Sequence, residues 1–242
     1  MTTALPTNPL EQYQWLENRL HSLIGPVKFS SEINLRLERM THLLSLIDNP
    51  HHAFRGIHVG GTSGKGSTST MIATILEEAG YTVGLHTSPH LQILNERHRV
   101  NGKLVPTSLL CEAYAEMLPA VEEVKASSKF GAPSYFEAQV ALSFYVFRKM
   151  GVEFGVIEVG LGGERDATNV LPAEIAVLTN VGLDHTEILG ETVVEIAKDK
   201  VGIIKEGQTV VTGVHQPDVF RVVMRRCALV DAEMWMIGRD FD

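Results

Sequence analysis

Hydrophobic residues recur every three or four positions near the start of the chain, a spacing that places them on one face of a helix. Two such stretches, residues 10–20 and 35–47, lie on either side of Gly25-Pro26, which interrupts the pattern and predicts two helices. The same spacing predicts further helices over residues 67–79, 108–126, 191–204 and 218–229.

A capping box predicts one more helix in the middle of the chain. Ser134 is followed three residues later by Glu137, an arrangement in which each side chain bonds the backbone N–H of the other residue. Apolar residues at helical spacing follow, and Gly151 is expected to end the helix.

Short apolar runs without polar alternation predict strands that are covered on both faces, as in a parallel sheet. The clearest runs are residues 154–159 and 175–179, and shorter ones predict strands at 57–59, 81–86, 209–212 and 234–237. Because these strands alternate with helices, we expect an α/β fold with a mostly parallel sheet and helices on both faces. No repeat or linker divides residues 1–242, so one domain is expected, with ligands at the carboxyl ends of the strands.

Composition and charge narrow the classes of partner. The 242 residues are 44% hydrophobic and carry a formal net charge of −8, which disfavours binding to nucleic acid or to an anionic membrane. Cys111 and Cys227 lie far apart and predict two buried free thiols rather than a disulfide or a zinc site. With no signal peptide or long apolar run, a soluble cytoplasmic protein is expected, and a monomer is the default.

A glycine-rich turn lies between the predicted strand at residues 57–59 and the next helix. Backbone N–H groups, a helix N-terminus and one lysine can converge there on phosphate oxygens. The spacing differs from the usual phosphate loop because Val59 takes the place of the first glycine and Gly66 separates Lys65 from Ser67. The expected nucleotide-binding residues are Thr62, Ser63, Gly64, Lys65, Gly66 and Ser67. A chance turn is the alternative, and the loop alone does not separate kinases, ATPases and ligases.

Three titratable residues are candidates for chemistry near this loop. Glu158 ends an apolar strand, and a buried carboxylate is costly unless it meets a cation. That cation is Mg²⁺ bound to nucleotide phosphates or, in the alternative, Arg165 or a lysine. His185 follows the next strand and is a ligand or a structural residue. Lys200 lies on a predicted amphipathic helix, where composition does not distinguish it from Lys198.

Five segments carry a more specific signal than the loop alone. They are residues 58–67, Thr87-Ser88-Pro89-His90, and residues 158–169, 182–185 and 200–205. In this order they resemble the N-terminal ATP-binding domain of the folylpolyglutamate synthase and dihydrofolate synthase family, which belongs with the Mur ligases. The resemblance covers the chain from about residue 10 to its end and implies a P-loop-type Mur ligase central domain.

The resemblance implies an ATP-dependent ligase that adds L-glutamate to dihydropteroate, to folates, or to both. The acceptor carboxylate would attack the γ-phosphate of ATP to give an acyl phosphate, from which the amine of glutamate displaces phosphate. Lys65, His185 and Lys200 are the implied catalytic residues. Ser88 and Glu158 would bind one Mg²⁺ and His185 a second. Lys200 would react with carbon dioxide, and the resulting carbamate anion would suit a magnesium site.

The resemblance also implies the substrate-binding residues. The segment that contains Tyr135 and Phe136 is similar to the family segment lining the pterin pocket, where an aromatic ring stacks on a flat heterocycle. Packing of Phe136 in the core is the alternative. Asn34, Leu35 and Asp166 match other family positions near the pterin. The implied small-molecule partners are ATP, glutamate, and a pterin or folate.

The sequence also departs from the family pattern. Ser63 replaces an asparagine of the loop but keeps a small polar turn residue, which preserves nucleotide binding. Arg36 and Glu164-Arg165 replace other residues near the pterin and bear on pterin specificity. Family members continue with a second α/β domain beyond the region matched here, so we expect that domain to lie outside this chain.

Two other functions remain open at this stage. A Mur-type amino-acid ligase is disfavoured by residues 87–90 and by the short N-terminal region. A non-catalytic nucleotide-binding module that regulates a partner would need only the phosphate loop. The joint presence of Ser88, Glu158, His185 and Lys200 is more easily explained by catalysis.

Overall fold

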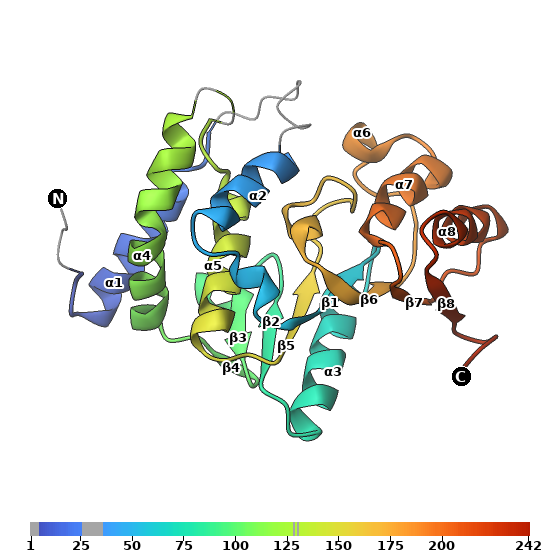
Figure 1. The fold of residues 1–242 in the computed structure, drawn as a ribbon, viewed down its shortest axis with the longest axis horizontal. Coiled ribbons are helices and arrows are strands. Elements are labelled where there is room, and N and C mark those ends of the chain that lie inside the picture. The colour runs from blue at the N-terminus through green and yellow to red at the C-terminus, as the bar shows by residue number, and fades with distance from the viewer. Residues whose placement is uncertain (1–4, 26–35, 128, 130) are drawn as a thin grey trace.

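A single mixed sheet organises the fold (Figure 1). Within residues 5–25, 36–127, 129 and 131–242, which the computed structural model describes, eight strands form it in the order β4-β3-β2-β5-β1-β6-β7-β8. The strands are β1 Arg55–Gly60, β2 Val83–His86, β3 His98–Val100, β4 Lys103–Leu104, β5 Phe154–Glu158, β6 Ala173–Leu178, β7 Thr209–Thr212 and β8 Glu233–Met236. All pairings from β2 to β8 are parallel, whereas β3 pairs antiparallel with both β2 and β4.

Helices precede the first strand and lie between later strands. They are α1 Pro9–His21, α2 Arg36–Ser45, α3 Lys65–Glu78, α4 Thr107–Ala126, α5 Tyr135–Lys149, α6 Thr186–Leu189, α7 Val193–Lys200 and α8 Pro217–Leu229. Four 3₁₀ turns occur in the described part of the chain: η2 Pro50–His52, η3 Leu94–Arg97, η4 Ala167–Val170 and η5 Val201–Ile203.

The two faces of the sheet are covered by different helices. Adjacent residues of a strand point to opposite faces, and on β5 Val156 packs with α3 while Ile157 joins the core formed with α1, α2, α4 and α5. Figure 1 shows these four helices gathered on one side and α3 across the sheet from them. A third core cluster joins α7 and α8 to β6 and β7. The prediction of a mostly parallel α/β fold with helices on both faces is confirmed.

The antiparallel edge was not predicted. Strands β3 and β4 are joined by Asn101 and Gly102, both with positive φ (48° and 67°), as in a tight hairpin turn. An Asn-Gly pair is the strongest short-range hairpin signal, so the sequence contained the information. The prediction of a helix over residues 191–204 was also too long. Thr192 caps α7 by accepting a bond from the N–H of Glu195, and the helix ends at Lys200 in η5.

Other predictions agree with the fold. The Ser134 capping box begins α5, and both cysteines are buried and unpaired. In the part of the chain that the structure describes, every helix is too short or too polar to cross a bilayer. Asn34 and Leu35, two of the expected substrate residues, lie outside the described residues.

Candidate active site

The glycine-rich loop joins β1 to α3 and leaves backbone N–H groups open to a ligand. Gly64 stands at the N-cap with φ of 77°, and because glycine has no side chain, the first-turn N–H groups of Gly66 and Ser67 are free of side-chain capping. Gly61 has φ of 139°, and a Cβ atom there would lie 2.0 Å from the hydroxyl oxygen of Thr179. The loop therefore requires glycine at position 61 and presents a helix N-terminus suited to phosphate.

The segment after β6 holds the loop in this shape. The N–H of Thr62 donates to the carbonyl of Asn180 over 2.9 Å, and the N–H of Ser63 donates to Oδ1 of Asn180 over 3.1 Å. The hydroxyl of Thr179 donates to the carbonyl of Ser63 over 2.8 Å. Lys65 turns back toward the loop, where its Nζ donates to the carbonyl of Thr62 over 3.3 Å. The loop is thus preorganised by the neighbouring strand end.

Glu158 and Ser88 come together beside the phosphate loop. The Oε2 atom of Glu158, a residue only 5% exposed at the end of β5, accepts a bond of 2.9 Å from the N–H of Ser88. A Cβ atom on Gly66 would lie 3.5 Å from both carboxylate oxygens of Glu158. Burial raises the pKa of Glu158, while the Ser88 N–H and the charges of Lys65 and Arg97 act in the opposite direction.

The alternative of a structural ion pair for Glu158 finds no support. Among the described residues, neither Arg165 nor any lysine lies within ion-pair distance of Glu158. The carboxylate therefore stands buried with one backbone donor. Together with the hydroxyl of Ser88 it makes an all-oxygen donor set, which fits Mg²⁺ in type. Within the described residues, no three His, Cys, Asp or Glu side chains cluster as a complete metal site, so phosphate oxygens and water would complete the shell.

His185 lies apart from Ser88 and Glu158. It caps the short helix α6 in the left-handed region (φ 47°), and its side chain is 47% exposed. Its nearest ionic neighbours in the described chain are Asp184 at 3.5 Å and Glu187 at 3.9 Å. The structure thus places His185 in the segment after β6, at the start of α6, and shows no contact between it and Ser88 or Glu158 in the described part of the chain.

Lys200 is buried against the phosphate loop. It is 2% exposed, and its Nζ donates to the carbonyl of Gly61 over 3.1 Å. Burial and the charge of Lys65 lower the pKa of Lys200, against the opposing charges of Asp184, Asp199 and Asp166. Lys198 on the same helix is exposed. Burial therefore distinguishes Lys200 from Lys198, which composition alone did not.

Two predicted substrate residues meet at Gly160. A Cβ atom at Gly160 would lie 2.4 Å from the ring of Phe136 and 3.1 Å from Oδ2 of Asp166. Asp166 is buried and accepts bonds of 2.9 Å from the N–H groups of Leu161 and Thr168. Burial raises the pKa of Asp166 despite these bonds. Phe136 is half-buried beside the core, so the ring is part of the packing and also reaches the turn that follows β5.

Tyr135 faces other neighbours. Its ring lies 5.7 Å from the ring of His21 and 5.7 Å from the guanidinium carbon of Arg97. Tyr135 and Phe136 therefore line two adjoining regions rather than one stack.

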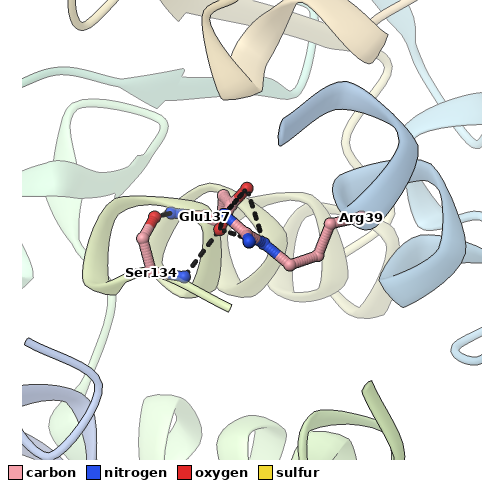
Figure 2. Close-up of polar contacts among 3 residues, drawn as sticks. All are labelled: Arg39, Ser134 and Glu137. Atoms are coloured by element: carbon pink, nitrogen blue, oxygen red, sulfur yellow. Dashed lines mark hydrogen bonds and ion pairs between the residues drawn. The ribbon is translucent and has the colours of Figure 1, made fainter. Parts of the chain in front are cut away.

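The N-terminus of α5, which carries both aromatic residues, is fixed by a buried ion pair (Figure 2). The guanidinium of Arg39 on α2 approaches both oxygens of Glu137, with Nε and Nη2 each 3.0 Å from a carboxylate oxygen. Glu137 also accepts a bond of 2.6 Å from the N–H of Ser134 and so completes the capping box. The side chains are 10% and 2% exposed, so the pair is held in low dielectric.

A family model, Mur ligase middle domain, matches residues 59–226. The chain belongs to the Mur ligase middle-domain family. The match begins at the last residues of β1 and ends in α8, so it contains the phosphate loop, Ser88, Glu158, His185 and Lys200.

Relatives of this Mur ligase domain carry folate-related names. The folylpolyglutamate synthase of Lacticaseibacillus casei is 42% identical over 203 residues, 84% of this chain and 47% of the relative. The dihydrofolate synthase/folylpolyglutamate synthase of Bacillus subtilis is 41% identical over 212 residues, which cover 87% of this chain and 48% of the relative. A solved FPGS-AMPPCP-folate complex is 38% identical with a TM-score of 0.86 over 94% of this chain and 54% of that one. The chain thus spans about half the length of the curated relatives it matches.

Two residues near the candidate site of this Mur ligase domain were not predicted from the sequence. Asn180, which organises the loop, follows β6 at its carboxyl end, where a polar residue is a signal for ligand contact. Arg97 is the last residue of η3 and directly precedes the unpredicted strand β3, so no predicted element included it. The hairpin signal at Asn101-Gly102 would have placed Arg97 near the sheet.

Proposed function

We propose that the protein carrying this chain is an ATP-dependent ligase that joins L-glutamate to dihydropteroate, to a folate, or to both. The observation that carries the proposal is the convergence of a carboxylate and a buried lysine on one phosphate loop. Glu158 lies against Gly66, and Lys200 donates to Gly61. The names of the relatives support the choice of glutamate and folate.

ATP would bind at residues 62–67. The open N–H groups at the start of α3 and the ammonium of Lys65 suit the triphosphate. The AMPPCP found with the solved relative supports this assignment. Ser63 departs from the usual loop sequence but would still support nucleotide binding, because its side chain and its N–H both bond Asn180.

Glu158 and the hydroxyl of Ser88 would hold a magnesium ion, and His185 would contribute to a second. When bound, such ions neutralise charge on phosphate oxygens and orient them. Ser88 and Glu158 are already adjacent, whereas His185 would act from the exposed start of α6.

The proposed reaction has two steps. An oxygen of the acceptor carboxylate forms a bond to the γ-phosphorus of ATP, and the bond to the β–γ bridging oxygen breaks, which releases ADP. The nitrogen of glutamate then attacks the acyl carbon, expels phosphate and loses a proton to give the amide. Lys65 would stabilise charge on the transferring phosphoryl group.

Lys200 would act as a carbamate. Its lowered pKa favours the neutral amine, which can attack carbon dioxide and lose a proton to form an anion. That anion would compensate the cations around the loop, since Lys65 already disfavours a second ammonium there.

Phe136 and Asp166 would contact the pterin, with Tyr135 at the adjoining surface. Asn34 and Leu35 stay predictions from the family resemblance, as do a cytoplasmic location and a monomeric state.

Mass spectrometry of the acceptor tests the proposal. The whole polypeptide that carries this chain, given ATP, Mg²⁺ and glutamate, should add one glutamate residue to dihydropteroate or to a reduced folate. Absence of this product with either acceptor, in protein shown to be folded, contradicts the proposed function.

A further inference from the structure

Arg97 is a buried cation without an acidic partner among the described residues. It is 7% exposed and ends η3. Its Nε donates to Nδ1 of His90 over 2.8 Å, and its guanidinium lies 5.7 Å from the centre of the Tyr135 ring. Within the described residues, no carboxylate lies within ion-pair distance of Arg97, and its terminal nitrogens make no hydrogen bond.

Arg39 provides an internal comparison. It is buried to the same extent, 8% exposed, and meets both oxygens of Glu137. An arginine is rarely buried unless it is paired, because removing its charge from water is costly. Arg97 bears this cost with no carboxylate at ion-pair distance in the described part of the chain, which indicates that its partner is a bound anion.

The position of Arg97 indicates which anion. The charges of Lys65 and Arg97 both act on Glu158, so both cations lie near that carboxylate. The guanidinium of Arg97 also lies near the ring of Tyr135. An acceptor whose flat heterocycle reaches the aromatic residues and whose carboxylate reacts beside Glu158 would bring that carboxylate near Arg97.

We infer that Arg97 binds the carboxylate of the acceptor substrate through its two terminal nitrogens and directs that group toward the γ-phosphate. The inference rests on the proposed function and adds a substrate-binding residue to it. A guanidinium presents parallel donors that match both oxygens of a carboxylate, whereas Lys65 already serves the phosphates. His90 fixes the guanidinium through Nε and leaves its other end for the substrate.

The test compares an acid with its amide in the whole polypeptide. Pteroate carries one carboxylate, and its primary amide has the same shape without the charge. Binding of both, and of an ATP analogue, is measured by calorimetry for wild type, Arg97→Met, Arg97→Lys and a control, Arg55→Met. Arg55 is an exposed arginine paired with Glu174, outside the proposed site.

We expect Arg97→Met to weaken binding of pteroate about 10- to 100-fold and to change binding of the amide and of the ATP analogue by less than about threefold. Arg97→Lys should weaken pteroate binding by an intermediate factor, because it keeps the charge but loses the parallel donors of the guanidinium. Arg55→Met should match wild type. Equal losses for acid and amide would overturn the inference.

Thermal unfolding separates this role from a structural one. Removal of an unpaired buried charge should leave the melting temperature unchanged or raise it. A large drop in the melting temperature of Arg97→Met would mean that Arg97 serves the fold, and the inference would fail. If wild type neither binds pteroate nor forms product with any acceptor, the proposed function fails and takes the inference with it. Product formation by wild type with no acid-specific loss in Arg97→Met overturns the inference alone.

Discussion

The Nζ atom of Lys200, at the end of α7, donates to the carbonyl of Gly61 over 3.1 Å, which joins a buried lysine to the phosphate loop. This contact links two motifs that lie 139 residues apart in the chain. It also places Lys200 against the phosphate loop, whereas Lys198 faces solvent.

Substitution of Lys200 should therefore abolish activity where substitution of Lys198 does not. We expect Lys200→Met to lower ADP release by at least about 100-fold and Lys198→Met to match wild type. If Lys200 is carbamylated, ¹³C NMR of protein in labelled bicarbonate should show a carbamate signal that Lys200→Met lacks. A carbamate signal that survives in Lys200→Met would assign the modification to another amine.

The raised pKa of Glu158 predicts a pH dependence for metal binding. Only the ionised carboxylate binds Mg²⁺, so the magnesium-dependent part of nucleotide affinity should fall as the pH drops toward this raised pKa, at a higher pH than for an ordinary glutamate. Glu158→Gln should remove this part at every pH. Calorimetric titrations of both proteins over a pH series measure the difference, and identical profiles would contradict the assignment.

The raised pKa of Glu158 also affects the stability of the metal-free protein. Because burial raises the folded-state pKa of Glu158, the favourable contribution of its protonated form is present at low pH and is lost as the pH rises through the raised pKa. Metal-free Glu158→Gln should then be at least as stable as wild type at neutral pH in urea unfolding. A clear loss of stability would show that the carboxylate serves the fold.

Gly61 should not tolerate a side chain. An alanine there would place Cβ 2.0 Å from the hydroxyl oxygen of Thr179 and would hold φ at 139°, a backbone strain of about 1–3 kcal/mol before the clash is counted. We expect Gly61→Ala to weaken nucleotide binding at least about tenfold. Gly80, at the far end of α3, also has positive φ but open space around it, so Gly80→Ala should bind nucleotide like wild type.

The Arg39–Glu137 pair should be a main support of the α2–α5 contact. Glu137→Gln removes the carboxylate charge that faces the buried guanidinium of Arg39, and we expect the free energy of unfolding to fall by about 3–5 kcal/mol. Arg55–Glu174 is an exposed pair, so Glu174→Gln should cost about 0–1 kcal/mol. Urea unfolding of both variants gives the comparison, and similar losses would contradict the importance of burial.

Hydrophobic patterning predicted the central strands because continuous apolar runs mark strands that are covered on both faces. It missed β3 and β4, which are three and two residues long and lie at the edge, where burial imposes little pattern. Only the Asn101-Gly102 turn marked them.

The motifs indicated which residues would lie near the phosphate loop. Ser88 and Glu158 are in contact, and their sharing of a metal stays a prediction. Local patterns did not indicate Arg97, because its burial and the absence of a carboxylate within ion-pair distance among the described residues depend on the packed fold. Likewise Lys200 and Lys198 are equivalent in sequence and differ only once α7 packs on the loop.

The most direct test of the account is ADP release by the whole polypeptide with ATP, Mg²⁺ and glutamate, with dihydropteroate or a reduced folate as acceptor. We expect release that requires both glutamate and an acceptor and that is lost in Glu158→Gln. Turnover with dihydropteroate would identify dihydrofolate synthase activity, and turnover only with the folate would identify chain extension. The absence of ADP release with both acceptors, or ADP release that does not depend on added glutamate, would contradict the proposed function.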